Sequence, residues 1–152
     1  MAEVVRRADA GVAVLGICNG FQILAEVGLL PGAMISNACL KFLCRPVDLE
    51  VATEASLFTA GYARGQAISL PIAHHDGNYV CSADERMRLE DQDRIAFRYL
   101  DNPNGSTGRI AGVLGAGRNV LGMMPHPERA ADPRLGGIDG KILFRALTEA
   151  LN

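Results

Sequence analysis

A cysteine framed by two glycines stands where an apolar run ends. Cys18 lies midway between Gly16 and Gly20, directly after the run that begins at Val12. This Gly-x-Cys-x-Gly pattern is typical of a nucleophile elbow, a strained strand-to-helix turn that presents a reactive side chain above a sheet. Glycines suit such a turn because a Cβ atom would clash where the chain doubles back. A helix beginning at the sulfur would also favour the thiolate through its dipole. The alternative is a small, buried apolar residue at a strand end.

The second group that could do chemistry is Pro125-His126-Pro127-Glu128, which follows the apolar segment Val120 to Met124. Prolines on both sides of His126 restrict the backbone, and Glu128 can reach one ring nitrogen while the other stays free. Together with Cys18, the pair supplies the nucleophile, base and orienting carboxylate of acyl transfer. Alone, the tetrapeptide could equally be a strand-end turn with a hydrogen-bonded histidine.

The remaining histidines, His74 and His75, are adjacent and therefore point in different directions. We expect one to be a surface side chain and the other to form a local hydrogen bond. Neither is predicted to act as the base.

The elements that must position these residues alternate between helical and strand patterns. Helices are expected over 1–10, from Cys18 to Gly28, over 84–94 and from Asp139, a plausible N-cap, to the C-terminus. Strands are expected over 12–17, 40–51, 67–73, 95–100, 110–114 and 120–124, the last two forming a hairpin. The apolar strand 12–17 favours a parallel sheet, and the alternation from Leu40 favours antiparallel strands. The chain is therefore predicted to be α/β.

Length and composition argue against several classes of protein. With 152 residues, 49% of them apolar, the chain is predicted to form one domain. A net charge of −2 without a basic tract argues against nucleic-acid binding. No apolar run has membrane-spanning length and no signal peptide is evident, which predicts a cytoplasmic protein. The four cysteines are expected to be reduced thiols without metal-binding spacing (Cys18, Cys39, Cys44 and Cys81).

A family resemblance narrows the function. Gly-Ile-Cys-Asn-Gly-Phe-Gln at 16–22 and Pro-His-Pro-Glu-Arg at 125–129 resemble the class I (triad) glutamine amidotransferases. Asn-Pro-Asn-Gly-Ser at 102–106 and Met-Met-Pro-His-Pro-Glu-Arg at 123–129 are similar to the glutaminase subunits of phosphoribosylformylglycinamidine synthase, from purine biosynthesis. The resemblance implies a flavodoxin-like three-layer fold with a mixed, mostly parallel central sheet plus antiparallel strands, in one partial domain spanning 1–152.

The same resemblance implies the roles of the site residues. Cys18 would attack the side-chain amide of L-glutamine, and His126, oriented by Glu128, would serve as the base. The backbone N–H of Asn19 would donate to the oxyanion. Gln22 and Gly20 would contact bound glutamine.

In this family, ammonia passes to an ATP-dependent synthetase subunit, so the resemblance implies no cofactor for this chain; ATP and Mg belong to the partner. A small accessory subunit is a further expected partner. Members also carry an opening βα region and a glycine-rich loop before the point where this chain begins, and that loop donates a second oxyanion N–H. We therefore expect an N-terminally truncated form. Two alternatives follow: an impaired module that only binds its synthetase, and a cysteine hydrolase acting on γ-glutamyl peptides.

Overall fold

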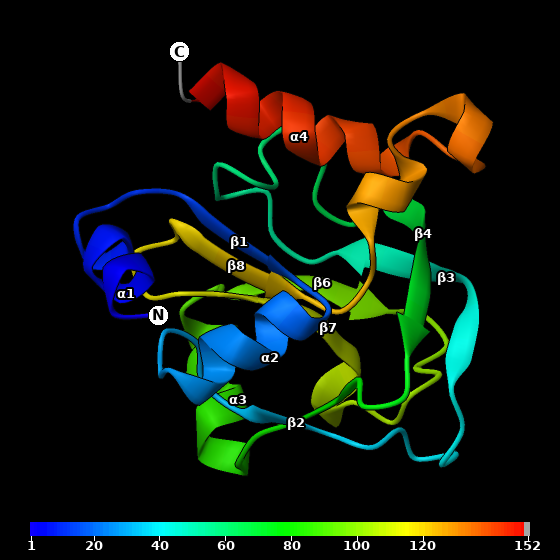
Figure 1. Cartoon of the computed structure of the whole chain (residues 1–152), viewed down its shortest axis with the longest axis horizontal. Coiled ribbons are helices and arrows are strands. Elements are labelled where there is room, and N and C mark those ends of the chain that lie inside the picture. The colour runs from blue at the N-terminus through cyan, green and yellow to red at the C-terminus, as the bar shows by residue number, and fades with distance from the viewer. Residues whose placement is uncertain (151–152) are drawn as a thin grey trace.

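A six-stranded mixed sheet runs through the centre of the computed structural model, which describes residues 1–150 (Figure 1). Its strands lie in the order β1-β8-β7-β6-β3-β4. Their bounds are β1 Val14–Ile17, β3 Leu43–Val51, β4 Ala67–His74, β6 Ile95–Tyr99, β7 Ile110–Leu114 and β8 Val120–Met123. A second, two-stranded sheet pairs β2 (Ala33–Ile35) with β5 (Asn78–Val80).

The balance of strand directions differs from the expectation. The sheet is mixed, as predicted, but β1 and β8 form its one parallel pair among the described residues; the other four pairings are antiparallel. The prediction of a mostly parallel sheet is therefore wrong for this stretch of chain. The physical reason is connectivity, because β7 and β8 are joined by a short hairpin, whereas parallel neighbours need a long crossover. That hairpin itself was predicted and is confirmed.

Helices cover both faces of the sheet and complete the expected three layers. They are α1 (Ala2–Asp9), α2 (Asn19–Glu26), α3 (Ala83–Asp91) and α4 (Asp139–Ala150). Leu143 of α4 packs in one apolar core with Leu49, and Phe21 of α2 packs in a second core with Leu89 of α3. In Figure 1, α4 accordingly lies on one side of the sheet and α1 to α3 on the other. No helix within residues 1–150 is long and apolar enough to cross a membrane.

Two local expectations need correction. The alternation from Leu40 does not begin a strand there, since β3 starts at Leu43 and the side chains of Leu40 and Phe42 are exposed. The carboxylate of Asp139 does not act as the expected cap. Instead it accepts the backbone N–H of Ser69 in β4, which ties the start of α4 to the sheet.

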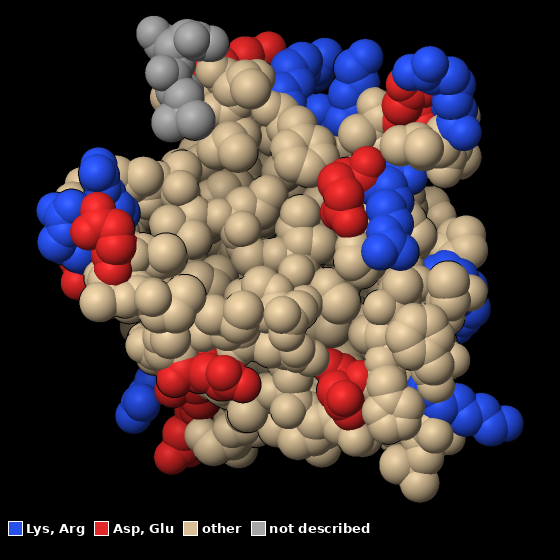
Figure 2. All heavy atoms as spheres, viewed as in Figure 1, with Lys and Arg blue, Asp and Glu red and all other residues tan. Residues whose placement is uncertain are grey.

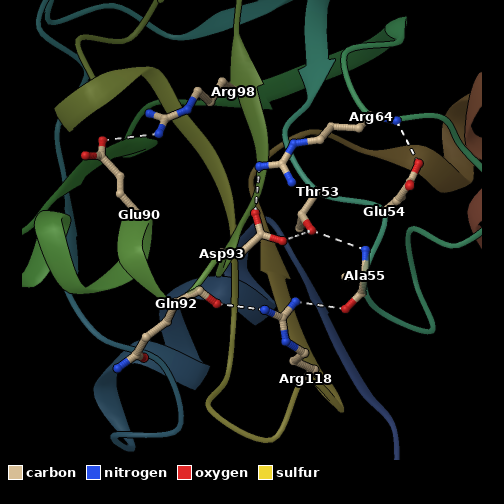
Figure 3. Close-up of polar contacts among 9 residues, drawn as sticks. All are labelled: Thr53, Glu54, Ala55, Arg64, Glu90, Gln92, Asp93, Arg98 and Arg118. Carbon is tan, nitrogen blue, oxygen red and sulfur yellow. Dashed lines mark hydrogen bonds and ion pairs between the residues drawn. The ribbon is translucent and has the colours of Figure 1, made fainter.

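Arginine side chains join three segments at one end of the sheet (Figure 3). Arg118, just before β8, donates to the carbonyl oxygens of Ala55 at 2.8 Å and Gln92 at 2.7 Å. Arg64 pairs with Asp93 at 2.9 Å. Arg118 precedes β8, so this network lies at the end of the sheet where β8 begins. Because β1 and β8 are parallel, β1 begins at the same end. The residues that follow the two strands therefore emerge at the opposite end.

Candidate active site

Cys18 occupies the predicted elbow between β1 and α2. Its φ of 53° and ψ of −110° place a non-glycine residue in a strained backbone conformation. Its backbone N–H donates to the carbonyl oxygen of Met123 in β8 at 2.8 Å, which anchors the elbow to the sheet. The strand-turn-helix context that a nucleophile elbow requires is present.

The two framing glycines have different reasons to be glycine. A Cβ atom on Gly16 would lie 2.5 Å from Leu24 Cδ1 and 2.7 Å from the carbonyl oxygen of Gly20, so the close return of α2 requires a glycine there. A Cβ atom on Gly20 would meet no atom within 4 Å. The steric expectation is confirmed for Gly16 and wrong for Gly20.

The thiol of Cys18 is half-buried, and burial is the largest influence on it. Desolvation raises its pKa, while the backbone N–H of Asn19 and the charge of Arg129 lower it and the carboxylate of Glu128 raises it. The net effect is a raised pKa, so the expectation that the start of α2 favours the thiolate is outweighed by burial. At rest the sulfur is a protonated thiol, 3.9 Å from the carbonyl oxygen of Ala73, and it needs a base.

His126 has the arrangement of such a base. Its side chain is buried, and Nδ1 lies 2.6 Å from Oε1 of Glu128. Because a carboxylate can only accept, Nδ1 carries the proton and Nε2 keeps a lone pair. That Nε2 atom is buried and has no hydrogen-bond partner among residues 1–150. The expected pairing of His126 with Glu128 is therefore present, with the second ring nitrogen left free.

Three strands bring the thiol and the imidazole to one corner of the molecule. Ile17 lies opposite Met123 in the parallel pair, so the chain leaves β1 and β8 at the same edge. The third strand, β4, contributes the Ala73 carbonyl beside the sulfur and the Pro71 carbonyl, which accepts the backbone N–H of His126 at 2.8 Å. After burial, the carboxylate of Glu128 also contributes to the raised pKa of the thiol.

The remaining predicted residues lie around the elbow. Asn19 is exposed at the start of α2, and its backbone N–H lowers the pKa of the Cys18 thiol. Gln22, one helical turn further on, donates to the carbonyl oxygen of Asp76 at 2.7 Å and lines a cleft of about 360 Å³ between α2 and β2. Its side chain is therefore held by the turn after β4. Contact of Asn19, Gly20 and Gln22 with glutamine stays a prediction.

The two adjacent histidines bear out the expectation only in part. One is exposed, as predicted, but that same residue makes the local hydrogen bond, and the other bonds to a residue 37 positions away. His75 is exposed and pairs with Asp76 at 3.0 Å, whereas His74 is buried and bonds to Asn37. The importance of Asn37 was missed, because a buried asparagine in a loop pattern carries no local signal of its partners.

Gly140 was also missed. A Cβ atom there would overlap the carbonyl of Pro127, so this glycine lets α4 approach the turn that holds His126. An isolated glycine inside a helical pattern was the available signal. Within residues 1–150, no group of three metal-binding side chains could hold a metal ion.

Similarity to known proteins agrees with this geometry. Residues 2–135 match the family of CobB/CobQ-like glutamine amidotransferase domains. The phosphoribosylformylglycinamidine synthase subunit PurQ of Cereibacter sphaeroides is 61% identical over 146 residues, covering 96% of this chain and 66% of that protein. The subunit of the same name from Roseobacter denitrificans is 59% identical, covering 98% of this chain and 67% of that protein. The chain thus spans about two thirds of the length of these relatives.

Solved structures show the same relationship. The structure of PurLQS from Thermotoga maritima matches with a TM-score of 0.90 at 43% identity, over 99% of this chain and 67% of that chain. A glutamine amidotransferase from Thermotoga maritima matches with a TM-score of 0.65 at 17% identity, over 99% of this chain and 66% of that chain, a likeness of fold alone.

Proposed function

Because the chain belongs to the family of CobB/CobQ-like glutamine amidotransferase domains, we propose that it is the glutaminase component of a phosphoribosylformylglycinamidine synthase. In this role it hydrolyses L-glutamine to glutamate and ammonia. The observation that carries the proposal is the convergence of Cys18 with the His126–Glu128 pair at one edge of β1 and β8. The identity of 61% to a PurQ subunit supports the choice of reaction.

The geometry suits acyl transfer through a thioester. Nε2 of His126 takes the proton of the Cys18 thiol, and the sulfur attacks the side-chain amide carbon of glutamine. The oxyanion that forms accepts the backbone N–H of Asn19. The imidazolium returns the proton to the departing nitrogen, which leaves as ammonia and a γ-glutamyl thioester remains.

Hydrolysis of the thioester completes the cycle. His126 then removes a proton from water, which attacks the thioester carbon and releases glutamate and the thiol. Glu128 holds the imidazole in the required tautomer and stabilises its charged form. Gln22 and Gly20 contact the bound glutamine from the first turns of α2.

Ammonia then passes to an ATP-dependent synthetase subunit, which uses the ATP and Mg, so this chain needs no cofactor of its own. A small accessory subunit is a further proposed partner, and the cytoplasm is the proposed location.

The centre of the face that carries α2 is almost free of charged side chains, which gather at its rim (Figure 2). Depletion of charge is typical of protein–protein interfaces. This supports a protein partner over a nucleic acid.

Glutamate release from L-glutamine, with and without the synthetase subunit, tests the proposal. The chain should release glutamate, Cys18→Ala should abolish release, and Cys44→Ala, at an exposed thiol, should retain it. Binding of the synthetase without any glutamate release would contradict the glutaminase and favour a docking module. Release of glutamate from γ-glutamyl peptides but not from glutamine would favour a peptide hydrolase.

A further inference from the structure

One ring nitrogen of His74 is buried without a hydrogen-bond partner. The residue is 4% exposed, and Nδ1 lies 3.1 Å from Oδ1 of Asn37. Nε2 contacts neither a donor nor an acceptor among residues 1–150. An unpaired polar atom in the interior costs folding free energy, so a ligand that supplied a donor to Nε2 would gain a hydrogen bond that the protein itself leaves unmade.

The hydrogen bonds of Asn37 determine which nitrogen of His74 is protonated. The Asn37 amide nitrogen donates to the carbonyl oxygens of Lys41 and His74, both at 2.9 Å. Its Oδ1 is therefore the acceptor, and it also receives the backbone N–H of Gly77 at 3.1 Å. Hence Nδ1 of His74 carries the proton and Nε2 keeps a bare lone pair.

His74 is also held neutral. Burial and the neighbouring His126 lower its pKa to about 4. At neutral pH the ring therefore neither donates through Nε2 nor competes with His126 for the thiol proton. Nε2 of His74 is therefore a hydrogen-bond acceptor in a fixed position.

His74 belongs to the strand that supports the candidate active site, and its ring is close enough to His126 for the two to interact electrostatically. His74 is the last residue of β4, and the carbonyl of the preceding Ala73 is 3.9 Å from the sulfur of Cys18. The same strand accepts the backbone N–H of His126 through Pro71. The nucleophile, the base and the unpaired nitrogen thus share β4 as a common support.

The reacting group of glutamine supplies the missing donor. When the carbonyl oxygen of its side-chain amide points at the N–H of Asn19, the amide nitrogen still has two hydrogens that need acceptors. We propose that Nε2 of His74 accepts one of them and thereby selects glutamine over glutamate. A glutamate carboxylate has no hydrogen to donate. Its oxygen lone pairs would face the lone pair of Nε2 of His74, and the two would repel each other. A site built to bind an N–H rejects an analogue that lacks it. This inference rests on the proposed glutaminase function.

Binding of L-glutamine and L-glutamate to the Cys18→Ala chain, measured by calorimetry, tests the proposal without turnover. In the Cys18→Ala chain, the variant His74→Asn places an amide nitrogen near the position of Nδ1, where it can keep the hydrogen bond to Asn37. It has no atom at the position of Nε2. His74→Gln reaches the place of Nε2 with its amide group. His75→Asn is the matched control, since His75 is exposed and pairs with Asp76.

We expect His74→Asn to weaken glutamine binding about tenfold or more, as loss of a buried hydrogen bond predicts. Glutamate binding should change less than about twofold, His74→Gln should restore part of the preference for glutamine, and His75→Asn should leave it intact. Equal weakening of both ligands by His74→Asn, or no change in either, would overturn the proposal.

Two further results are also decisive. If the Cys18→Ala chain binds neither ligand, the proposed function fails together with this inference. If it prefers glutamine and His74→Asn keeps that preference, only the role of His74 fails. Should His74→Asn not fold, His74→Gln decides, because its amide is a less fixed acceptor than the ring: a preference for glutamine weaker than that of the chain with His74 supports the proposal, and an undiminished preference refutes it.

Discussion

The backbone N–H of Cys18 donates to the carbonyl oxygen of Met123 at 2.8 Å. This bond continues the parallel pairing of β1 and β8 by one step beyond Ile17. Met123 is followed within three residues by His126, so a single strand pair brings two distant segments of the chain together. The candidate active site is therefore a direct consequence of sheet pairing.

Removing the charge of Glu128 should impair the base. Glu128→Gln keeps the shape of the side chain but loses the carboxylate that lies 2.6 Å from Nδ1 of His126. We expect kcat/KM for glutamine to fall on the order of 10²-fold, because the tautomer and the charged form of the imidazole are no longer favoured. Glu149→Gln, at an exposed residue paired with Arg145, is the control. Equal activity of both variants would contradict the orienting role.

The glycine frame predicts a contrast in stability. Gly16→Ala should lower the free energy of unfolding by about 1–3 kcal/mol, because its Cβ atom overlaps Leu24 and the backbone of α2. Gly20→Ala meets no atom and replaces a glycine in a helix, so stability should stay the same or rise by up to about 1 kcal/mol. Urea unfolding of both variants provides the measurement. Similar losses in the two would refute this description of the elbow.

The thiol of Cys18 should be harder to ionise in the folded chain than in the unfolded one. Burial raises its pKa, so the midpoint of the pH profile for iodoacetamide alkylation should shift upward on folding. Glu128→Gln should shift the midpoint back down, because the carboxylate contributes to the raised pKa. Peptide mapping resolves Cys18 from the other cysteines, with the chain in urea as reference. A folded midpoint below the unfolded one would instead show a stabilised thiolate.

His74 should make the protein less stable in mild acid. Its folded pKa of about 4 lies below the ordinary value of 6.5, so between these values the unfolded chain binds a proton that the folded chain does not. The free energy of unfolding should therefore fall as pH drops from about 6.5 to about 4, by up to about 3 kcal/mol from this group. His74→Gln should remove that part of the pH dependence, and His75→Gln should not. Identical profiles for both variants would contradict a buried, neutral His74.

Local chemistry could be predicted from the sequence. Glycines around Cys18 and prolines around His126 constrain the backbone within a few residues, so their patterns indicated an elbow and an oriented imidazole without knowledge of the fold. The hairpin of β7 and β8 was also predictable, since its turn residues lie between two apolar runs. The resemblance to class I glutamine amidotransferases is confirmed by the family match over residues 2–135.

Features that depend on distant segments could not be predicted. The alternation at Leu40 and Phe42 favoured a strand, but no neighbour covers those side chains and β3 begins after them. The raised pKa of the Cys18 thiol reflects burial by the whole fold, which outweighs the local effect of α2. Likewise, the unpaired nitrogen of His74 follows from the bonds of Asn37, a residue far away in the sequence.

With His126 as its base, the sulfur of Cys18 should form a γ-glutamyl thioester. Acid quenching of the chain mixed with L-glutamine, followed by mass spectrometry of its peptides, tests this most directly. A glutamyl adduct should appear on the peptide that contains Cys18, and His126→Ala should reduce its rate of formation on the order of 10²-fold or more. Hydrolysis of glutamine without an adduct at any quenching time, or an adduct that forms equally fast in His126→Ala, would contradict the account.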